Sequence, residues 1–268
     1  MRAISLLFHD VYETSPDESG FLSAAANRYK LGLADFDLQL EGVAQVRNDA
    51  PLVVGGVGRA LLSGPGGSKE QDPPYVVTVD DGGVSYHTII AGRLEQRGWC
   101  GHCFVSTDFV GQRGFLTADQ IRDLDARGHV IGSHSASHPA RFSSLAYDEM
   151  VREWTRSREA LEEILGHDVE VGSVPGGYFS STVARAAGEA GLRILFTSEP
   201  VTSIQPGPDC QLIGRFTIRR GDAADAAQRF VVPAPWARST AWVSWNAKGL
   251  VKPLLGPSYR RIADWVFS

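Results

Sequence analysis

A unit of helix, glycine and strand occurs four times along this 268-residue sequence. In each copy a helix-like stretch ends at a glycine, and a β-rich stretch follows that ends in small polar residues. The copies are LEQRGWCGHCFVST from Leu94, LDARGHVIGSH from Leu124, LEEILGHDVEVGS from Leu161 and AGEAGLRILFTS from Ala187. Glycine adopts the left-handed conformation at a helix end without strain, so we interpret one glycine in each copy as a helix end. These glycines are Gly98, Gly128, Gly166 and Gly191.

Alternating helices and strands predict α/β units with parallel strands. Two further apolar runs, Ile4–Phe8 and Val76–Val79, bring the expected strands to at least six. We expect an α/β fold, and a barrel rather than an open sheet. Two pairs of residues have the spacing of helix N-caps: Thr117 with Gln120, and Asp222 with Asp225.

The carboxyl ends of the expected strands carry chemically active side chains. In a parallel α/β fold the active site forms at these strand ends. The residues there are His9 and Asp10, Asp80 and Asp81, His134 and His138, and the turn Pro175-Gly176-Gly177. Metal-binding and acid–base groups gathered at one end of a barrel are difficult to explain as structure alone.

His134, His138 and a carboxylate form a candidate metal site. Two imidazoles and a carboxylate suit Zn²⁺ or a similar ion and leave positions open for water and substrate. Each part alone has a plainer explanation: two histidines four residues apart are usually incidental, and an aspartate after a strand often caps the next helix. Their combination favours a metal. The other histidines, which we expect to be surface or core residues, are His87, His102, His129 and His167.

Three motifs follow one another in the sequence: TVDDG at 78–82, HSASHP at 134–139 and PGG at 175–177. In residue type, order and spacing they resemble the motifs T-F-D-D-G, H-S/T-x-x-H-P and P-x-G of the NodB-type polysaccharide deacetylases, carbohydrate esterase family four. The match extends from about Val76 to Pro200. The resemblance implies a distorted (β/α) barrel of the NodB-homology type, in agreement with the repeated unit.

Two departures from the family pattern concern catalytic groups. The arginine that the family usually has two residues before the proline of the third motif is Ser173 here, and no L-x-H motif follows. Both absences resemble the branch of poly-N-acetylglucosamine deacetylases, which begins with a strand like L-M-Y-H-D-V; residues 6–11 here read LLFHDV. That branch takes its acid histidine from this strand, which implies that role for His9. We expect Arg215, in LIGRFTIRRG, to replace the missing arginine.

The resemblance implies a metal-dependent hydrolase that removes N-acetyl groups from an amino sugar. The implied metal ligands are Asp81, His134 and His138, with Zn²⁺ as the first expectation and Ni²⁺, Co²⁺ or Fe²⁺ as alternatives. The implied catalytic residues are Asp80 as the base that takes a proton from water, His9 as the acid for the leaving amine, Gly176 as the backbone donor to the oxyanion, and Arg215 as the partner of Asp80.

Two other functions are compatible with the same residues. One is a C–N hydrolase of this fold that acts on a small amide, formamide or ureide, because the motifs place the metal but not the substrate pocket. The other is a non-catalytic glycan-binding module. Asp80 argues against the binding module, since binding alone needs no base beside a metal ligand.

The sequence WCGHC at 99–103 reads like a thioredoxin-type redox centre. Such a centre places its first sulfur at a helix N-terminus, where the helix dipole favours the thiolate. Here Gly98 ends a helix and residues 104–107 continue a strand, so Cys100 and Cys103 enter a strand instead. We therefore expect the match to be coincidental. Three cysteines also do not suit a disulfide framework and favour a reducing compartment.

We expect residues 1–235 to form a single deacetylase domain. Within it, residues 48–74 are rich in glycine and proline and indicate a mobile loop insertion. Residues 236–268 contain four tryptophans and several basic residues. We expect this tail to be helical and either to pack on the barrel or to lie at a membrane surface.

Charge and hydropathy restrict the partners and the location. The net charge of −5, from 26 Lys+Arg and 31 Asp+Glu, gives no indication of nucleic-acid binding. The first apolar run, Ile4–Phe8, is shorter than the roughly 7–15 residues of a signal peptide, and no run approaches the ~20 residues of a membrane span. We expect a cytoplasmic protein, with the tail as a peripheral contact to the inner membrane, and an N-acetylated saccharide as its partner.

Overall fold

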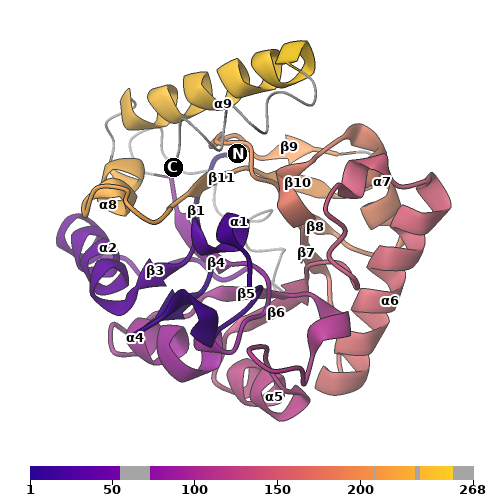
Figure 1. Ribbon diagram of the computed structural model, residues 1–268, viewed down its shortest axis with the longest axis horizontal. Coiled ribbons are helices and arrows are strands. Elements are labelled where there is room, and N and C mark those ends of the chain that lie inside the picture. Colours follow the sequence, from indigo (N-terminus) through magenta and orange to yellow (C-terminus); the bar gives the residue numbers. More distant parts are fainter. Residues whose placement is uncertain (55–72, 208, 233–235, 256–268) are drawn as a thin grey trace.

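Nine strands in the described residues form one curled sheet with helices around it (Figure 1). The computed structural model describes residues 1–54, 73–207, 209–232 and 236–255, of which 247–255 by backbone alone. The strands are β1 (Ile4–Phe8), β4 (Tyr75–Val79), β5 (His102–Val105), β6 (Val130–Ser133), β7 (Val171–Ser173), β8 (Ile194–Phe196), β9 (Gln205–Pro206), β10 (Gln211–Ile213) and β11 (Arg215–Thr217). Their order is β11-β1-β4-β5-β6-β7-β8-β10-β9, and only β9 with β10 is antiparallel. The expected distorted (β/α) barrel is confirmed.

Helices cover the outer face of the curled sheet (Figure 1). The described helices are α1 (Ala24–Asn27), α2 (Leu33–Val46), α4 (Ala91–Glu95), α5 (Ala118–Ala126), α6 (Tyr147–Leu165), α7 (Ser181–Glu189), α8 (Ala226–Val231) and α9 (Trp236–Leu255). Of these, α2 and α4 to α8 lie around the ring of strands in Figure 1. A π-helical turn, Tyr86–Ile90, precedes α4. Two short strands, β2 (Val11–Tyr12) and β3 (Leu31–Gly32), pair with each other outside the main sheet.

A single residue, Gly214, connects the two ends of the sheet. It separates β10, which pairs with β8, from β11, which pairs with β1. A Cβ at Gly214 would lie 2.3 Å from the carbonyl oxygen of Glu199, so only glycine fits where the chain passes from one edge to the other. The sheet therefore curls so far that β10 and β11, which pair with strands at opposite ends of it, follow each other in the sequence. This places Arg215 beside β1.

The expected helix ends are confirmed by the backbone. All four glycines of the repeated unit have positive φ, between 70° at Gly98 and 95° at Gly191. The capping box of Thr117 and Gln120 is also present, with both reciprocal hydrogen bonds. The expected cap at Asp222 is wrong, because α8 begins only at Ala226. The carboxylate of Asp222 instead accepts the backbone N–H of Arg219 at 2.7 Å and closes a turn.

Apolar side chains fill the barrel and the space outside it. Inside, Phe104, Phe196 and their neighbours form a buried cluster. A larger cluster lies between the sheet and helices α2, α4 and α5. The strand ends that carry the candidate site are thus supported on both faces of the sheet.

The loop insertion expected at 48–74 lies largely outside the described residues, which stop at Val54 and resume at 73. Val54 itself is fully buried, and its N–H donates to Nε2 of the buried His102 at 2.9 Å. The first part of this segment is therefore packed against the barrel.

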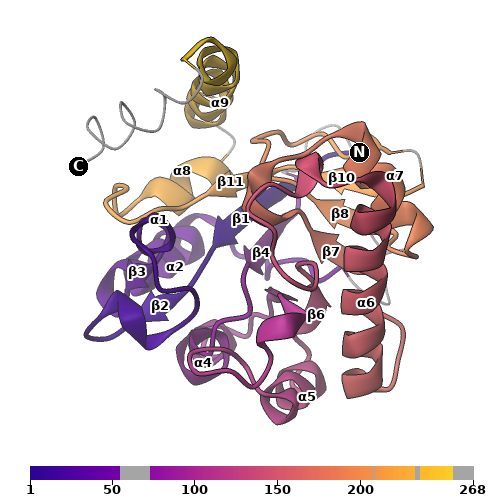
Figure 2. The same cartoon turned by 45° about the vertical axis from the view of Figure 1, so that its right-hand side comes forward.

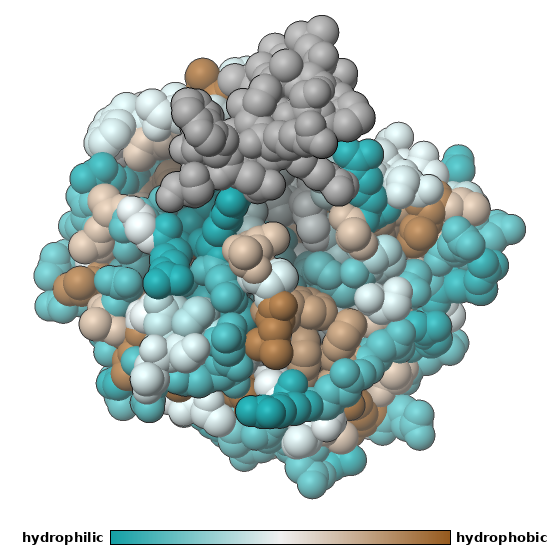
Figure 3. Space-filling model, viewed as in Figure 1, coloured by the Kyte–Doolittle hydropathy of each residue, from teal (hydrophilic) through white to brown (hydrophobic). Residues whose placement is uncertain are grey.

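The tail expected from residue 236 begins with helix α9. In Figures 1 and 2, α9 lies outside the ring of strands, on the side of α8 and β11. Trp236 and Trp242 are 57% and 47% exposed on it. Across the described helices, none combines the length and apolar content that crossing a bilayer needs. The face seen in Figure 3 is mostly hydrophilic, with a compact hydrophobic area near its centre.

Candidate metal and catalytic site

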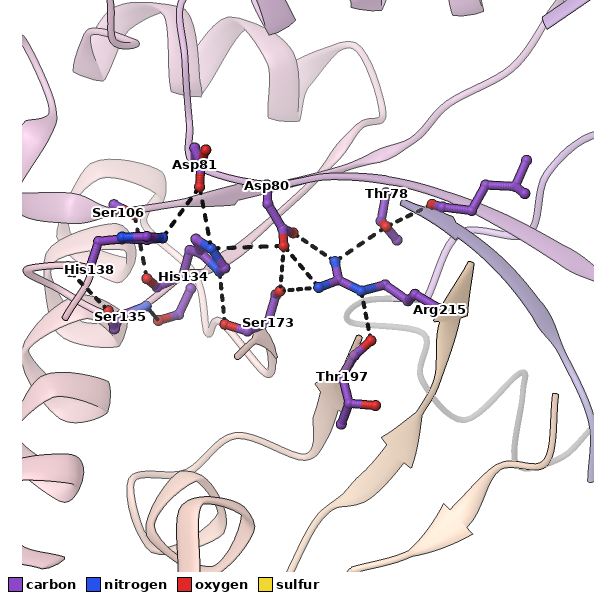
Figure 4. Close-up of polar contacts among 12 residues, drawn as sticks. Thr78, Asp80, Asp81, Ser106, His134, Ser135, His138, Ser173, Thr197 and Arg215 are labelled. Atoms are coloured by element: carbon purple, nitrogen blue, oxygen red, sulfur yellow. Dashed lines mark hydrogen bonds and ion pairs between the residues drawn. The ribbon is translucent and has the colours of Figure 1, made fainter. Parts of the chain in front are cut away.

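Three side chains from two strand ends converge on one point (Figure 4). Asp81 follows β4, and His134 and His138 follow β6. Nε2 of each histidine lies 3.5 Å from Oδ1 of Asp81, and the candidate ligand atoms all lie within 4.8 Å of one another. Two imidazoles and a carboxylate at this spacing can hold one divalent cation.

The backbone around these ligands is held in an unusual conformation. Asp81, Ser135 and His138 have φ of 80°, 62° and 51°, and they are the non-glycine residues with positive φ in the described part of the chain. A left-handed non-glycine residue costs about 1–2 kcal/mol and persists only where its surroundings fix it. The fold therefore holds the ligand positions before any cation binds.

One hydrogen bond determines how His134 faces the cluster. Its Nδ1 donates to the carbonyl oxygen of Ser173 at 2.9 Å, so Nε2 keeps its lone pair on the side of Asp81. Metal-binding histidines commonly donate their other ring N–H in this way. The turn between the two histidines is held by Glu153 of α6, whose carboxylate accepts the N–H of Ser137 at 2.8 Å. This donor set fits a divalent cation.

Asp80 is buried between the cluster and Arg215 (Figure 4). Nη1 and Nη2 of Arg215 donate to Oδ1 and Oδ2 of Asp80 at 2.7 and 2.8 Å. Ser173 Oγ donates to Oδ2 at 3.1 Å and accepts from Arg215 Nη2 at 2.7 Å. On its other side, Oδ2 lies 3.8 Å from Nε2 of His134. The carboxylate is therefore fixed in place and faces the candidate metal ligands.

The pKa values at the site follow from burial and from these neighbours. Burial acts to raise the pKa of Asp80, but Arg215 and His134 outweigh it, so this pKa lies below its usual value. The pKa of Asp81 is also well below its usual value, because its histidine neighbours outweigh burial. For His134, burial lowers the pKa, but Asp80 and Asp81 outweigh it and the pKa is raised. Both carboxylates are thus charged at neutral pH and attract a cation.

His9 and Gly176 lie at the ends of two other strands. His9 follows β1, its ring packs on Tyr29 at 4.8 Å between centroids, and its Nδ1 is buried with no hydrogen-bond partner. Burial lowers the pKa of His9, while the charges of Asp81 and Asp80 act in the opposite direction. Gly176 follows β7 and has φ of 63°, a conformation that suits glycine. The structure therefore brings these expected residues to the same end of the barrel.

Two residues near the site had no signal in the sequence. The ring of Phe21 packs on the imidazole of His138 at 4.7 Å between centroids. Lys30 is buried, and its Nζ donates to three backbone carbonyls, those of Pro16, Ser19 and Phe21, at 2.6–2.8 Å. Lys30 therefore fixes the loop that places Phe21 against a candidate ligand.

Asp10 is a further buried carboxyl group in this region. Its Oδ1 accepts from Ser19 Oγ at 2.6 Å and from Ser85 Oγ at 2.7 Å, while Oδ2 has no partner. Burial raises the pKa of Asp10 to about 6. Asp10 thus connects the N-terminal loop to the segment that follows Asp81.

The two cysteines of the WCGHC segment are not among the candidate metal ligands. Cys103 is within β5, Cys100 precedes that strand, and neither forms a disulfide. Burial raises the pKa of both thiols. The thiolate that redox chemistry requires is therefore disfavoured. Apart from His9, four histidines lie outside the cluster: His102 and His129 are buried in the core, and His87 and His167 pair with surface aspartates.

The sequence profile of the polysaccharide deacetylase family matches residues 67–195. The Bacillus subtilis (strain 168) protein YxkH, which carries a polysaccharide deacetylase name, is 22% identical over 132 residues, and the match covers 49% of this chain and 47% of YxkH. The chain thus spans about half the length of this relative.

Several solved structures share the fold of this chain. The Streptococcus pyogenes deacetylase PplD, in complex with acetate, has a TM-score of 0.68 at 19% identity and covers 87% of this chain and 99% of its own. IcaB from Ammonifex degensii has a TM-score of 0.62 at 21% identity, with coverage of 90% and 96%. A de-N-acetylase from Aggregatibacter actinomycetemcomitans has a TM-score of 0.68 at 16% identity, with coverage of 86% and 100%.

Proposed function

We propose that the chain hydrolyses N-acetyl groups of an amino sugar in a glycan, and the match of residues 67–195 to the polysaccharide deacetylase family supports this proposal. One arrangement carries the proposal: a buried carboxylate, Asp80, fixed by Arg215, faces a cluster that can hold a divalent cation. A binding module would need the cluster but not an oriented base beside it. This arrangement therefore favours hydrolysis over binding alone.

Asp81, His134 and His138 would hold the cation. A bound divalent ion, with Zn²⁺ the best match to two imidazoles and a carboxylate, polarises a carbonyl group and acidifies water. Asp80 takes the proton of the attacking water on a carboxylate oxygen. Its lowered pKa keeps that oxygen unprotonated at neutral pH, and Arg215 prevents the carboxylate from rotating away.

Two further groups stabilise the developing oxyanion and protonate the leaving nitrogen. The backbone N–H of Gly176 donates to the oxyanion that develops on the acetyl group, since glycine lets the main chain approach closely. His9 gives a proton to the leaving nitrogen, because an amine leaves far more readily than an amide anion. Its position at the end of β1, beside the charges of Asp80 and Asp81, supports this role and the place of the chain in the poly-N-acetylglucosamine deacetylase branch.

Acetate release tests this function directly. Wild-type protein is assayed for acetate release from N-acetylglucosamine oligomers, and for formate or ammonia release from small formamides and ureides. Each assay is run before and after chelation and with Zn²⁺, Ni²⁺, Co²⁺ or Fe²⁺ restored. We expect release from the oligomers that chelation abolishes. Hydrolysis of the small amides alone would establish the alternative C–N hydrolase, and saccharide binding without hydrolysis would establish a glycan-binding module.

Variants separate the proposed roles. His134→Ala should lose bound metal, measured by elemental analysis, while His167→Ala, which removes an exposed histidine paired with Asp125, should retain it. Asp80→Asn and His9→Ala should each lose about 10²–10⁴-fold in turnover, the usual contribution of a positioned base or acid, and keep their metal. Near-normal turnover in His9→Ala would remove His9 from the mechanism.

A further inference from the structure

Helix α9 presents one of its faces to the barrel. On this inner face Ala237 is buried, and Ala241 packs against the larger apolar cluster. Trp245 reaches the turn after β7, where a Cβ built on Gly177 would lie 3.6 Å from its Cη2. The three α9 residues are spaced four apart, as one side of a helix requires. The helix is thus attached to the barrel beside the candidate site.

The outer face of α9 carries large apolar side chains that are exposed. Trp242 and Val243 are 47% and 58% exposed, and Trp236 at the start of the helix is 57% exposed. Trp236 and Val243 are seven residues apart, so they lie on the same side of the helix. In the described part of the chain, eight large apolar side chains are 36% or more exposed, and three of them lie within residues 236–243. Such a concentration indicates a contact surface rather than scattered surface residues.

Charge distinguishes the tail from the rest of the chain. Residues 236–268 contain five Lys+Arg and one Asp, a net charge of +4. The whole chain has 26 Lys+Arg and 31 Asp+Glu, so residues 1–235 have 21 and 30, a net charge of −9. The charged residues of α9 are Arg238, Lys248 and Lys252, and its sequence contains no acidic residue. An anionic surface therefore attracts the tail and repels the rest of the molecule.

This combination of side chains fits a lipid surface better than other partners. Tryptophan prefers the boundary between lipid headgroups and acyl chains, and basic residues are attracted to anionic headgroups. A nucleic acid would use the positive charges but not an apolar face. A symmetric pair of copies of this chain, joined through α9, would bring two positively charged tails together.

We propose that the outer face of α9 docks on an anionic phospholipid bilayer, with Trp242 and Val243 at the boundary between headgroups and acyl chains. The basic residues of the tail supply the attraction to the headgroups. Because the inner face of α9 contacts the turn beside Gly177, docking holds the barrel at the lipid surface while the helix stays in place. This inference goes beyond the proposed function and does not depend on it.

Co-sedimentation with vesicles tests the docking. The probes are vesicles of phosphatidylcholine alone and vesicles of phosphatidylcholine mixed equally with phosphatidylglycerol. Wild-type protein should bind the mixed vesicles far more tightly. Raising the salt from about 0.1 M to about 1 M should release it, because the screening length falls from about 10 Å to about 3 Å. Equal binding to both kinds of vesicle, or no binding to the mixed ones, would overturn the inference.

Two double variants separate the apolar and the charged contributions. Trp242→Ser with Val243→Ser should lower the partition coefficient about 10- to 100-fold, because two apolar side chains no longer enter the boundary region. Lys248→Gln with Lys252→Gln should lower it about 30-fold on the mixed vesicles, since each basic residue near an anionic surface contributes about fivefold. Wild-type partitioning in the serine variant would show that α9 does not make the contact.

A matched control removes two exposed apolar side chains from another helix. Leu38 and Val46 are exposed on α2, so Leu38→Ser with Val46→Ser should bind vesicles as the wild type does. Equal loss of binding in this control would overturn the assignment to α9. Both serine variants should keep the wild-type midpoint of urea unfolding, which separates lost docking from lost folding.

Fluorescence gives a readout at Trp242 itself. Brominated phosphatidylcholine in the mixed vesicles should quench the wild type more than Trp242→Phe, which should still bind. Equal quenching of the two proteins would place Trp242 outside the bilayer and overturn the inference. So would a dimer in light scattering that Trp242→Ser with Val243→Ser dissociates, because the face would then belong to a second copy. Acetate release from soluble oligomers should be unchanged in that variant, so failure of docking and failure of the proposed function are distinguishable.

Discussion

Replacing Arg215 with methionine isolates the group that holds the proposed base. Methionine retains much of the packing against Phe104 and Phe196 but removes the charge and both hydrogen bonds to Asp80, at 2.7 and 2.8 Å. Asp80 remains buried, with Ser173 as a neutral donor. Breaking a buried ion pair by removing one partner costs about 3–5 kcal/mol, because the remaining charge is uncompensated.

Part of this free energy appears as a loss of folding stability, and part appears as a higher pKa of Asp80. In the wild type the pKa of Asp80 is depressed, so the pair stabilises the fold above the unfolded-state pKa and this contribution is lost as the pH falls through the folded-state pKa. Without Arg215, burial dominates and raises the pKa. A protonated Asp80 cannot accept a proton from water, so turnover should fall, first at acidic pH. The full loss should approach the about 10²–10⁴-fold decrease that is expected without a base.

The assay is the pH profile of kcat/KM together with urea unfolding at pH 7. We expect the acidic limb of Arg215→Met to move to higher pH and its unfolding free energy to fall. Ser173→Ala keeps both charges and removes only the two hydrogen bonds of a neutral hydroxyl, so its unfolding free energy should fall by about 1.5–3 kcal/mol while its pH profile stays close to that of the wild type. An Arg215→Met protein with the wild-type acidic limb and a loss below 1 kcal/mol would refute this account of Asp80.

Three other variants test features away from the Asp80 pair. Asp10→Asn should raise the unfolding free energy of the metal-free protein at pH 7 by up to about 3 kcal/mol. The reason is that a carboxyl pKa raised to about 6 makes the wild type lose stability as the pH rises from about 4. Equal unfolding free energies at pH 5 and pH 7 in both proteins would contradict this prediction. Lys30→Met should lower the unfolding free energy by at least about 1.5–3 kcal/mol, and it should weaken acetate release because it frees the loop that carries Phe21. Unchanged urea unfolding would count against this role of Lys30. The double variant Cys100→Ser and Cys103→Ser should retain acetate release, and insulin reduction by the wild type would show that the motif is redox-active.

Local sequence signals predicted the architecture because each acts within a few residues. A glycine with positive φ ends each repeated helix, and the strand that follows has few other ways to bury its apolar residues. The cap expected at Asp222 failed for an equally local reason, since the same carboxylate can close a turn instead of starting a helix. Sequence alone does not decide between those two uses.

The candidate ligands could be named in advance because they lie directly at strand ends. Asp81 follows β4 and His134 follows β6, and because these parallel strands are separated only by β5, their carboxyl ends lie at the same end of the barrel. Phe21 and Lys30 lie in a loop whose path depends on hydrogen bonds to distant carbonyls, and no periodicity marks them.

The passage of the chain through Gly214 has a consequence for biosynthesis. Asp80 and Arg215 are 135 residues apart, so at about 5–20 residues per second a ribosome adds the arginine roughly 7–27 s after the aspartate. During that interval β1 has no partner on one edge, and the Asp80 carboxylate has no cation. Unpaired edges promote aggregation, so the free edge of β1 is a site of aggregation until β11 is made. Catalytic competence and closure of the sheet are therefore gained in the same step of synthesis.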